Sequence, residues 1–390
     1  MSIGKSLEAR VRERLAEWRS AGLLRAPHPP SGIDFSSNDY LNLATHPLIV
    51  ERLAESARRD GAGSTGSRLL RGDRDAFRAL EHRFAGFKRT QGSLYFSSGY
   101  LANLAVLTTL TERGDVVFSD ALNHASLIDG VRLSAARRVV FPHNDVDELA
   151  RLLDEDVARG GDGHRFVVVE SLFSMDGDMA PLEKYAALCR AAGASLVVDE
   201  AHAVGVYGAR GSGLIEAAGV DSDVCVSVNT AGKALGVSGA FVAGPQWAID
   251  YLVQRARPFV FSTAAPPPLA AAIDASLEIV EREPERRQRV TARAMQLRRR
   301  LADAGVAATA GVSQIIPVVI GGNEQAVAVA AQLQAEGFDV RAIRPPTVPP
   351  GTARLRISVN AGLSEATIDR FAVAVAAAMR GVGLCSAVSL

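Results

Sequence analysis

Short apolar runs alternate with helix-like segments over the middle of the chain, from about residue 75 to about residue 245. Seven runs rich in Val, Leu and Phe have the length and composition of buried strands: residues 93–96, 115–118, 138–141, 166–169, 196–198, 224–228 and 240–243. Segments with helical character separate several of them, among them residues 146–157 and 181–192. This alternation predicts an α/β fold with a doubly wound, mostly parallel seven-stranded sheet.

The C-terminal third has a different pattern, in which a long helical stretch precedes more widely spaced apolar runs. The helical stretch covers residues 265–305, and Pro284 is expected to break it. Residues 314–320, 339–343 and 354–359 are then expected as strands, with helices between and after them. We therefore predict a large domain at residues 46–290, followed along the chain by a smaller C-terminal α+β domain at residues 291–390.

The N-terminal segment looks unable to fold by itself. Residues 5–20 predict a charged amphipathic helix, and Pro27, Pro29 and Pro30 prevent its continuation into an extended segment at residues 33–40. This segment has too little apolar surface to form its own core. We expect residues 1–45 to be an arm that lies on the rest of the protein.

Composition narrows the classes of partner. Lys and Arg number 43, as do Asp and Glu, so a net charge of zero gives no support for binding nucleic acid or an anionic membrane. No apolar run approaches the roughly 18 residues of a membrane helix, and the first ten residues lack the apolar core of a signal peptide. Cys189, Cys225 and Cys385 are too few and too scattered for a disulfide framework or a zinc site. We expect a cytoplasmic enzyme without a metal, acting on small molecules.

Two polar residues that follow predicted strands favour chemistry with pyridoxal phosphate. Asp199 follows the run 195–198, and Lys233 lies in a glycine-flanked segment after the run 223–228. A lysine amine forms a Schiff base with the aldehyde of this cofactor, and a carboxylate keeps its pyridine nitrogen protonated. The carboxyl ends of parallel strands share one sheet edge, where open α/β sheets bind ligands. A lone lysine is usually a solvated loop residue, but the spacing of Lys233 from Asp199 and His202 favours a role in binding pyridoxal phosphate.

Other polar residues follow the same set of strands. Residues 97–100, Ser-Ser-Gly-Tyr, open a predicted helix whose free amides could bind a phosphate, although an ordinary helix cap has the same sequence. His124 could stack on the pyridine ring, whereas a lone histidine is more often structural. Ser174 offers a hydroxyl to the ring edge or forms only a polar turn. Thr230 could reach the phosphate, and His202 could bond the ring's phenolate oxygen.

Five segments of the chain resemble the α-oxoamine synthases: residues 35–41, 63–69, 173–182, 198–202 and 232–236. The resemblance covers nearly the whole chain. It implies a fold-type I architecture, pyridoxal 5'-phosphate as cofactor, and a homodimer with active sites at the subunit interface. It also implies that an amino acid is joined to an acyl-CoA with loss of carbon dioxide.

The same resemblance implies a role for each candidate residue. Lys233 would bind the cofactor covalently, His124 would stack on its ring, and Asp199 would face its pyridine nitrogen. Ser174 and His202 fall on ring-contact positions. The phosphate site would comprise Ser98, Gly99, Tyr100 and Thr230, with Ser262 and Thr263 of the other subunit. Arg356 would bind the amino-acid carboxylate, Arg344 and Thr347 would lie on the acyl side, and Arg25 and Asn38 match further substrate contacts.

The segment 343–357 most resembles the family members that condense L-alanine with pimeloyl-CoA, or with a pimeloyl carrier thioester, in biotin biosynthesis. Two alternatives stay open. One is another α-oxoamine synthase that uses glycine or alanine with an acetyl, succinyl or fatty acyl-CoA. The other is an aminotransferase or lyase on the same fold, which would release no CoA.

Overall fold

The structure is a computed structural model that describes residues 5–384, so Cys385 lies outside it. Within these residues a seven-stranded sheet has the order β2-β8-β7-β6-β5-β3-β4, and only β8 runs antiparallel to its neighbours. Its strands are β2 (Gly92–Phe96), β3 (Val116–Asp120), β4 (Arg137–Phe141), β5 (Arg165–Glu170), β6 (Ala194–Asp199), β7 (Val224–Thr230) and β8 (Ala240–Gly244). The seven strands predicted from the apolar runs, and their mostly parallel arrangement, are confirmed.

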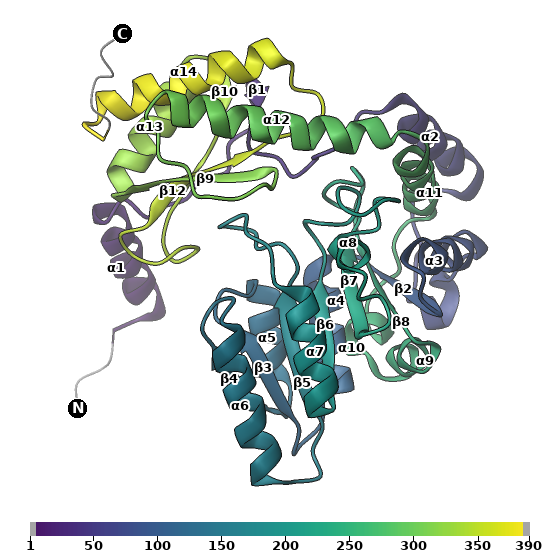
Figure 1. The fold of residues 1–390 in the computed structure, drawn as a ribbon. Helices are drawn as coiled ribbons and strands as arrows, with labels where there is room; N and C mark the ends of the chain where they lie inside the picture. The colour runs from purple at the N-terminus through teal and green to yellow at the C-terminus, as the bar shows by residue number, and fades with distance from the viewer. Residues whose placement is uncertain (1–4, 385–390) are drawn as a thin grey trace.

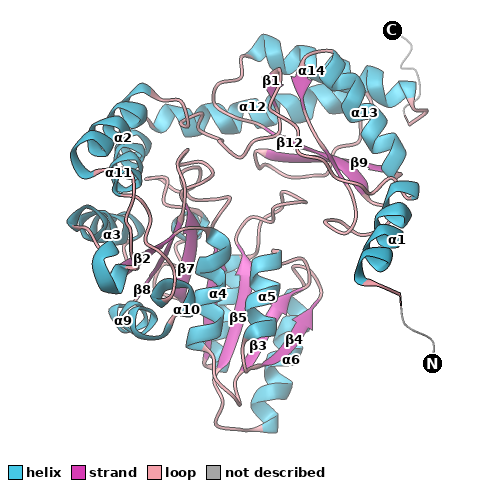
Figure 2. Cartoon of the chain, turned by 180° about the vertical axis from the view of Figure 1, so that it is seen from behind, coloured by secondary structure: helices cyan, strands magenta, loops and turns pink. Residues whose placement is uncertain are grey.

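Helices cover both faces of this sheet, as the two opposite views show (Figures 1 and 2). One face packs against α3, α6 and α7 and the other against α4, α5 and α9, so each face has its own apolar cluster. The helices of this part are α2 (Pro47–Asp60), α3 (Asp75–Lys88), α4 (Gly99–Leu110), α5 (Ala125–Leu133), α6 (Val146–Arg159), α7 (Leu182–Ala192), α8 (Leu214–Ala218), α9 (Gln246–Arg255), α10 (Arg257–Val260), α11 (Pro267–Arg282) and the π-helical turn η1 (Arg68–Gly72). With both faces covered, the inner parallel strands β3, β5, β6 and β7 are mostly buried, which explains their continuous apolar runs, whereas the edge strand β4 is largely exposed.

The C-terminal part is a second layered unit with its own apolar cluster. An antiparallel sheet of order β11-β12-β9 packs against three helices. These elements are α12 (Pro284–Asp303), β9 (Ile315–Gly321), α13 (Asn323–Ala335), β10 (Phe338–Asp339), β11 (Ala342–Ile343), β12 (Ala353–Ser358) and α14 (Glu365–Gly381). The predicted break at Pro284 is confirmed, because α11 ends at Arg282 and α12 begins at Pro284.

The N-terminal arm lies on the C-terminal part. β1 (Ile33–Asp34) pairs in parallel with β10, and the Phe35 ring stacks on Phe371 with centroids 3.7 Å apart. The single strand predicted for residues 339–343 is therefore wrong: β10 pairs with the arm, whereas β11 pairs with β12. The preceding helix α1 (Leu7–Ser20) forms as predicted but buries none of its residues.

The linker between the two parts is helical. Val290 of α12 packs into the large apolar cluster, and Ala294 of the same helix packs into the C-terminal one. Because α12 continues through residues 290 and 291, a domain boundary at that point stays a prediction.

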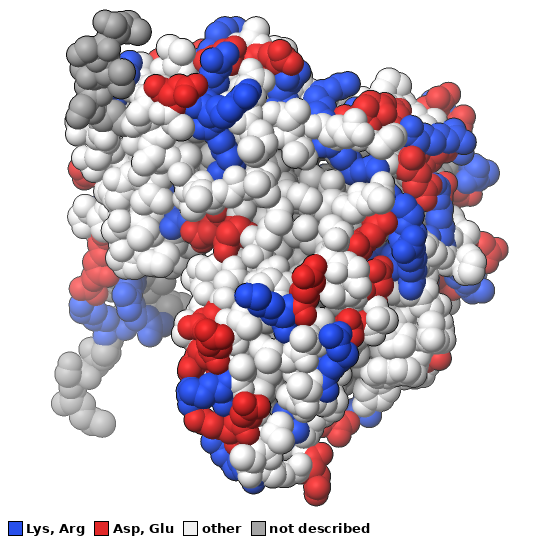
Figure 3. All heavy atoms as spheres, in the orientation of Figure 1, with Lys and Arg blue, Asp and Glu red and all other residues white. Residues whose placement is uncertain are grey.

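The surface carries both signs of charge in close mixture. On the face shown in Figure 3, Lys and Arg side chains lie interspersed with Asp and Glu side chains. This agrees with the zero net charge of the sequence. No helix in the described part of the chain is long and apolar enough to cross a membrane.

Candidate active site

The candidate site lies at the carboxyl ends of β5, β6 and β7. Glu170 ends β5 beside Asp199, which ends β6, and Lys233 follows the end of β7. Asp199 is buried and held on both oxygens: the Asn103 side-chain amide donates to Oδ2 at 2.7 Å, and the backbone N–H of Ala201 donates to Oδ1 at 2.7 Å. The strand ends therefore bring a lysine amine and a fixed carboxylate to one edge, as the sequence predicts.

A chain of hydrogen bonds leads from Lys233 to Arg356. Lys233 Nζ lies 2.8 Å from His202 Nε2, and His202 Nδ1 lies 2.6 Å from the Tyr40 hydroxyl. When Lys233 donates to Nε2, the ring proton resides on Nδ1 and is donated to Tyr40. The Tyr40 hydroxyl then donates to Asn38 Oδ1 at 3.0 Å, and Arg356 Nη2 donates to the same oxygen at 3.0 Å. Lysine and arginine are thus parts of one site, although β7 and β12 belong to different sheets.

Burial and neighbouring charge set the proton affinities in this site. Burial lowers the pKa of Lys233 to about 8, against the opposing effect of Asp199 and Glu170. Burial raises the pKa of Glu170 to about 8, and the charge of Asp199 adds to this. Burial, together with the positive charge of Lys233, holds the pKa of His202 well below its ordinary value. Near neutral pH, Glu170 and His202 are therefore mainly neutral.

His124 belongs to the same polar network. Its Nδ1 lies 2.7 Å from the Ser126 hydroxyl, which accepts a bond from Asn103 at 2.9 Å, and Asn103 in turn donates to Asp199. Burial lowers the pKa of His124, so the ring is neutral and suited to stacking on an aromatic cation.

The start of α4 forms the candidate anion site. Ser98 caps the helix, since its Oγ accepts from the backbone N–H of Leu101 at 3.2 Å. A side chain at Gly99 would place its Cβ 2.7 Å from Thr230 Cγ2, so glycine allows the helix start to lie against the end of β7. The Thr230 hydroxyl donates to the Ala201 carbonyl at 3.1 Å, and the Tyr100 hydroxyl bonds Asp129. Ser98, Gly99 and Thr230 are thus close together, whereas the Tyr100 side chain is engaged on α5.

The remaining candidates fall into two further groups. Ser262 and Thr263 line a small cavity with Ser97 and Arg68 of the same chain, and their contribution to another subunit's site stays a prediction. Of the residues expected on the acyl side, Arg25 donates to the Thr347 hydroxyl at 3.0 Å, and both line a groove with Arg344. Arg344 donates to the backbone carbonyls of residues 22 and 24, so it anchors the arm beside this groove.

Comparison with known proteins agrees with this geometry. Residues 30–375 match the family described as aminotransferase class I and II. The chain belongs to this family. Within the aminotransferase family, it is similar to the 8-amino-7-oxononanoate synthase of Anaeromyxobacter dehalogenans (strain 2CP-1), with 49% identity over 89% of this chain and 86% of that protein. It is also similar to the enzyme of that name from Marinobacter nauticus, with 44% identity over 95% of this chain and 94% of that protein.

Solved structures show the same architecture. The Sphingomonas wittichii serine palmitoyltransferase has a TM-score of 0.90 and 30% identity, and the match covers 98% of this chain and 100% of that chain. The 8-amino-7-oxononanoate synthase of Francisella tularensis has a TM-score of 0.76 and 28% identity, covering 90% and 99%. The predicted fold-type I architecture and the resemblance to α-oxoamine synthases are confirmed.

Sequence reasoning missed four residues of the site. Tyr40, Asn103 and Glu170 complete the network around Lys233, and Gln314 donates to the His202 carbonyl at 2.9 Å. Glu170 could have been found, because an acid that ends an apolar strand beside Asp199 is unusual. Asn103 and Gln314 gave no signal, because each looks like any polar residue until the fold brings it to the site.

Proposed function

We propose that the protein condenses L-alanine with pimeloyl-CoA, or with a pimeloyl carrier thioester, to give 8-amino-7-oxononanoate, free thiol and carbon dioxide. The names of relatives that are 44–49% identical support this choice of substrates. The hydrogen-bonded path from Lys233 to Arg356 carries the chemical part of the proposal, because it joins a candidate base to a candidate carboxylate-binding group.

The residues at the sheet edge fit pyridoxal phosphate as the cofactor. Gly99 lets the start of α4 lie against Thr230, and the buried Glu170 Oε1 has no hydrogen-bond partner among the described residues. Lys233 would hold the aldehyde carbon, Asp199 the pyridine nitrogen, and Ser98, Gly99 and Thr230 the phosphate. When bound, this cofactor supplies an electron sink for the α-carbon of the amino acid.

The protein's own groups would bind the substrate and move its protons. Arg356 would bind the carboxylate of alanine through a charge-assisted pair, which orients the α-carbon. The Lys233 amine, with a pKa of about 8, can take up the α-proton near neutral pH and return it later. Asp199 would keep a proton on the pyridine nitrogen, because Asn103 and the Ala201 amide fix its carboxylate in place.

We further propose that the protein is a cytoplasmic homodimer whose subunits share the active sites. Support comes from the resemblance to the α-oxoamine synthases and from exposed apolar residues near Ser262 and Thr263, among them Phe261 and Leu70. In such a dimer Ser262 and Thr263 would reach the phosphate bound by the partner.

A four-way kinetic comparison tests the proposed function. Purified holoenzyme is incubated with alanine or glycine against pimeloyl-CoA or succinyl-CoA, and free thiol, carbon dioxide and product mass are measured. Alanine with the pimeloyl thioester is expected to be fastest, with one carbon dioxide released per thiol. Faster turnover of glycine with the short acyl-CoA would indicate another α-oxoamine synthase. Amino transfer without thiol release would indicate an aminotransferase.

A further inference from the structure

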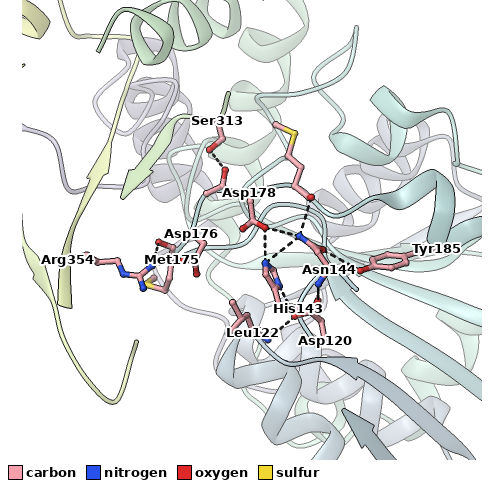
Figure 4. A network of polar contacts seen from close by, with 12 residues as sticks. Asp120, Leu122, His143, Asn144, Met175, Asp176, Asp178, Tyr185, Ser313 and Arg354 are labelled. Carbon is pink, nitrogen blue, oxygen red and sulfur yellow. Dashed lines mark hydrogen bonds and ion pairs between the residues drawn. The ribbon is translucent and has the colours of Figure 1, made fainter. Parts of the chain in front are cut away.

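A histidine outside the candidate site joins two acids at the carboxyl end of the sheet (Figure 4). His143, which follows β4, lies with Nδ1 2.9 Å from Asp120 Oδ1 and with Nε2 2.7 Å from Asp178 Oδ2. Asn144 supports the same two acids: its backbone N–H donates to Asp120 at 2.9 Å and its side-chain amide donates to Asp178 at 2.8 Å. Asp120 ends β3, whereas Asp178 belongs to the loop after β5, so the cluster ties that loop to the sheet.

The charge state of His143 follows from its partners. Carboxylate oxygens only accept, so both ring nitrogens donate and the ring is an imidazolium. Burial by itself lowers the pKa of His143, but the hydrogen bonds and charges of Asp120 and Asp178 outweigh it and raise the pKa to about 10. Beside the cluster lie the Phe173 ring, whose edge-on contact with His143 has a centroid distance of 4.4 Å, and the Tyr185 hydroxyl and the Met179 carbonyl, each 3.4 Å from the Asn144 side chain.

The loop that His143 holds contacts the C-terminal part on its other side. The backbone carbonyl of Ser174 accepts from Arg356 Nε. Asp176 pairs with Arg354 Nη1 at 2.6 Å, and the Gly177 carbonyl accepts from the Ser313 hydroxyl at 2.5 Å. Residues 173–178 therefore lie between two anchors, with the Asp120 cluster on one side and β12 on the other.

The same cluster borders a groove beside Thr347. Asp120 Oδ1 accepts from the backbone N–H of Leu122 at 2.8 Å, which fixes the segment that leads to His124. Leu122, Met175 of the clamped loop and Thr347 all line this groove. A shift of the loop would move one wall of this groove and the carbonyl that holds Arg356.

We propose that His143 is a positioning residue whose two ring N–H groups hold residues 173–178 against the end of β3, and thereby keep Arg356 in place for the amino-acid carboxylate. Its effect on substrate rests on the proposed function. Its effect on the loop does not, so the two can be tested separately.

The experiment compares His143→Gln with His164→Gln in the holoenzyme. Glutamine cannot donate to both carboxylates at this spacing. His164 is a matched control because its ring bonds the Ser195 hydroxyl at the opposite end of β5, away from the Asp120 cluster. In His143→Gln, hydrogen exchange of the loop amides of residues 173 and 177 is expected to accelerate about tenfold. The KM for alanine should rise about tenfold, with kcat and the thioester KM changed less than about threefold. The control should match the parent protein.

Asp178→Asn provides a second variant if His143→Gln folds poorly. It keeps the ring's pairing with Asp120 and weakens the bond to the loop, because a neutral amide oxygen is a poorer acceptor than a carboxylate, so a smaller acceleration and a smaller rise in KM for alanine are expected in the same direction. Unchanged loop exchange in both variants would overturn the clamp. Faster exchange with an unchanged KM for alanine would overturn the role in positioning Arg356. If the parent protein turns over no thioester, the proposed function fails, while the exchange data still decide whether the clamp exists.

Discussion

Lys233 is the residue whose chemistry depends most directly on its surroundings. Its Nζ donates to a neutral histidine and faces the carboxylate of Asp199, and burial brings its pKa to about 8. Borohydride reduction of the holoenzyme should therefore fix the cofactor to this amine, and Lys233→Ala should show no mass increase on intact-protein mass spectrometry. Lys184→Ala is the control, because Lys184 is exposed on α7. Covalent labelling that survives in Lys233→Ala would contradict the assignment.

Arg356 should affect one substrate far more than the other. It is buried, and its guanidinium already contacts the Ser174 carbonyl, Ser358 and Asn38, so its position is fixed before substrate arrives. A charge-assisted pair contributes on the order of 1.5–3 kcal/mol, so Arg356→Ala should raise the KM for alanine roughly 10- to 150-fold. The KM for the acyl thioester should stay within about threefold. Equal rises in both KM values, measured by steady-state kinetics, would contradict the assignment of Arg356 as the group that binds the carboxylate of alanine.

The contribution of His143 to the stability of the folded protein should depend on pH. Its pKa is raised in the folded state to about 10 from the ordinary value of 6.5, so the folded protein binds the ring proton more tightly than the unfolded chain does. The resulting stabilisation is fully present below about pH 6.5 and is lost as pH rises through about 10. Thermal unfolding should show His143→Gln less stable than the parent protein at pH 6.5, with the difference closing by pH 10. A constant difference would mean that the ring charge does not contribute.

At the scale of elements, the seven strands could be predicted because burial makes most of them continuous apolar runs, and even the largely exposed edge strand β4 keeps three apolar residues, Val139, Val140 and Phe141. The separation of β10 from β11 could not be predicted, because β10 forms by pairing with β1 of the arm, about 300 residues away in sequence. The residues of the candidate site also divide into those that the sequence predicts and those that depend on tertiary packing. Lys233 and Asp199 were predictable from their spacing after strands, whereas Asn103 was not, since its bond to Asp199 depends on how α4 packs on the sheet.

A buried ion pair joins three elements behind the site. Lys88 at the end of α3 pairs with Glu200, which follows β6 and also accepts from the backbone N–H of Ile215 on α8. Both side chains are buried, so Lys88→Met would leave Glu200 without its countercharge and should cost about 3–5 kcal/mol of the free energy of unfolding. Urea denaturation measures this, with the exposed Lys184→Met as the control. Adding Glu200→Gln should recover part of the loss, and a double variant no more stable than Lys88→Met would contradict the account.

At the scale of the whole molecule, the arrangement of exposed apolar residues bears on the proposed dimer. Leu70 of η1 is 85% exposed, and Phe261 after α10 is 71% exposed. The bridge between Ser67 and Thr263 brings these two segments together. Large side chains with such exposure next to polar residues of a candidate phosphate site are typical of an interface rather than of a free surface.

Phe261→Asp should therefore weaken the dimer, because it places a charge among apolar side chains that the interface would bury. Sedimentation at micromolar concentration is expected to show a shift from dimer toward monomer, together with faster loss of pyridoxal phosphate on dialysis, since Ser262 and Thr263 would no longer reach the partner's phosphate. Val373→Asp is the control, because Val373 is 66% exposed but lies on α14 in the C-terminal part. A Phe261→Asp protein that remains dimeric and keeps its cofactor would place the interface elsewhere on the surface and leave Ser262 and Thr263 without a shared role.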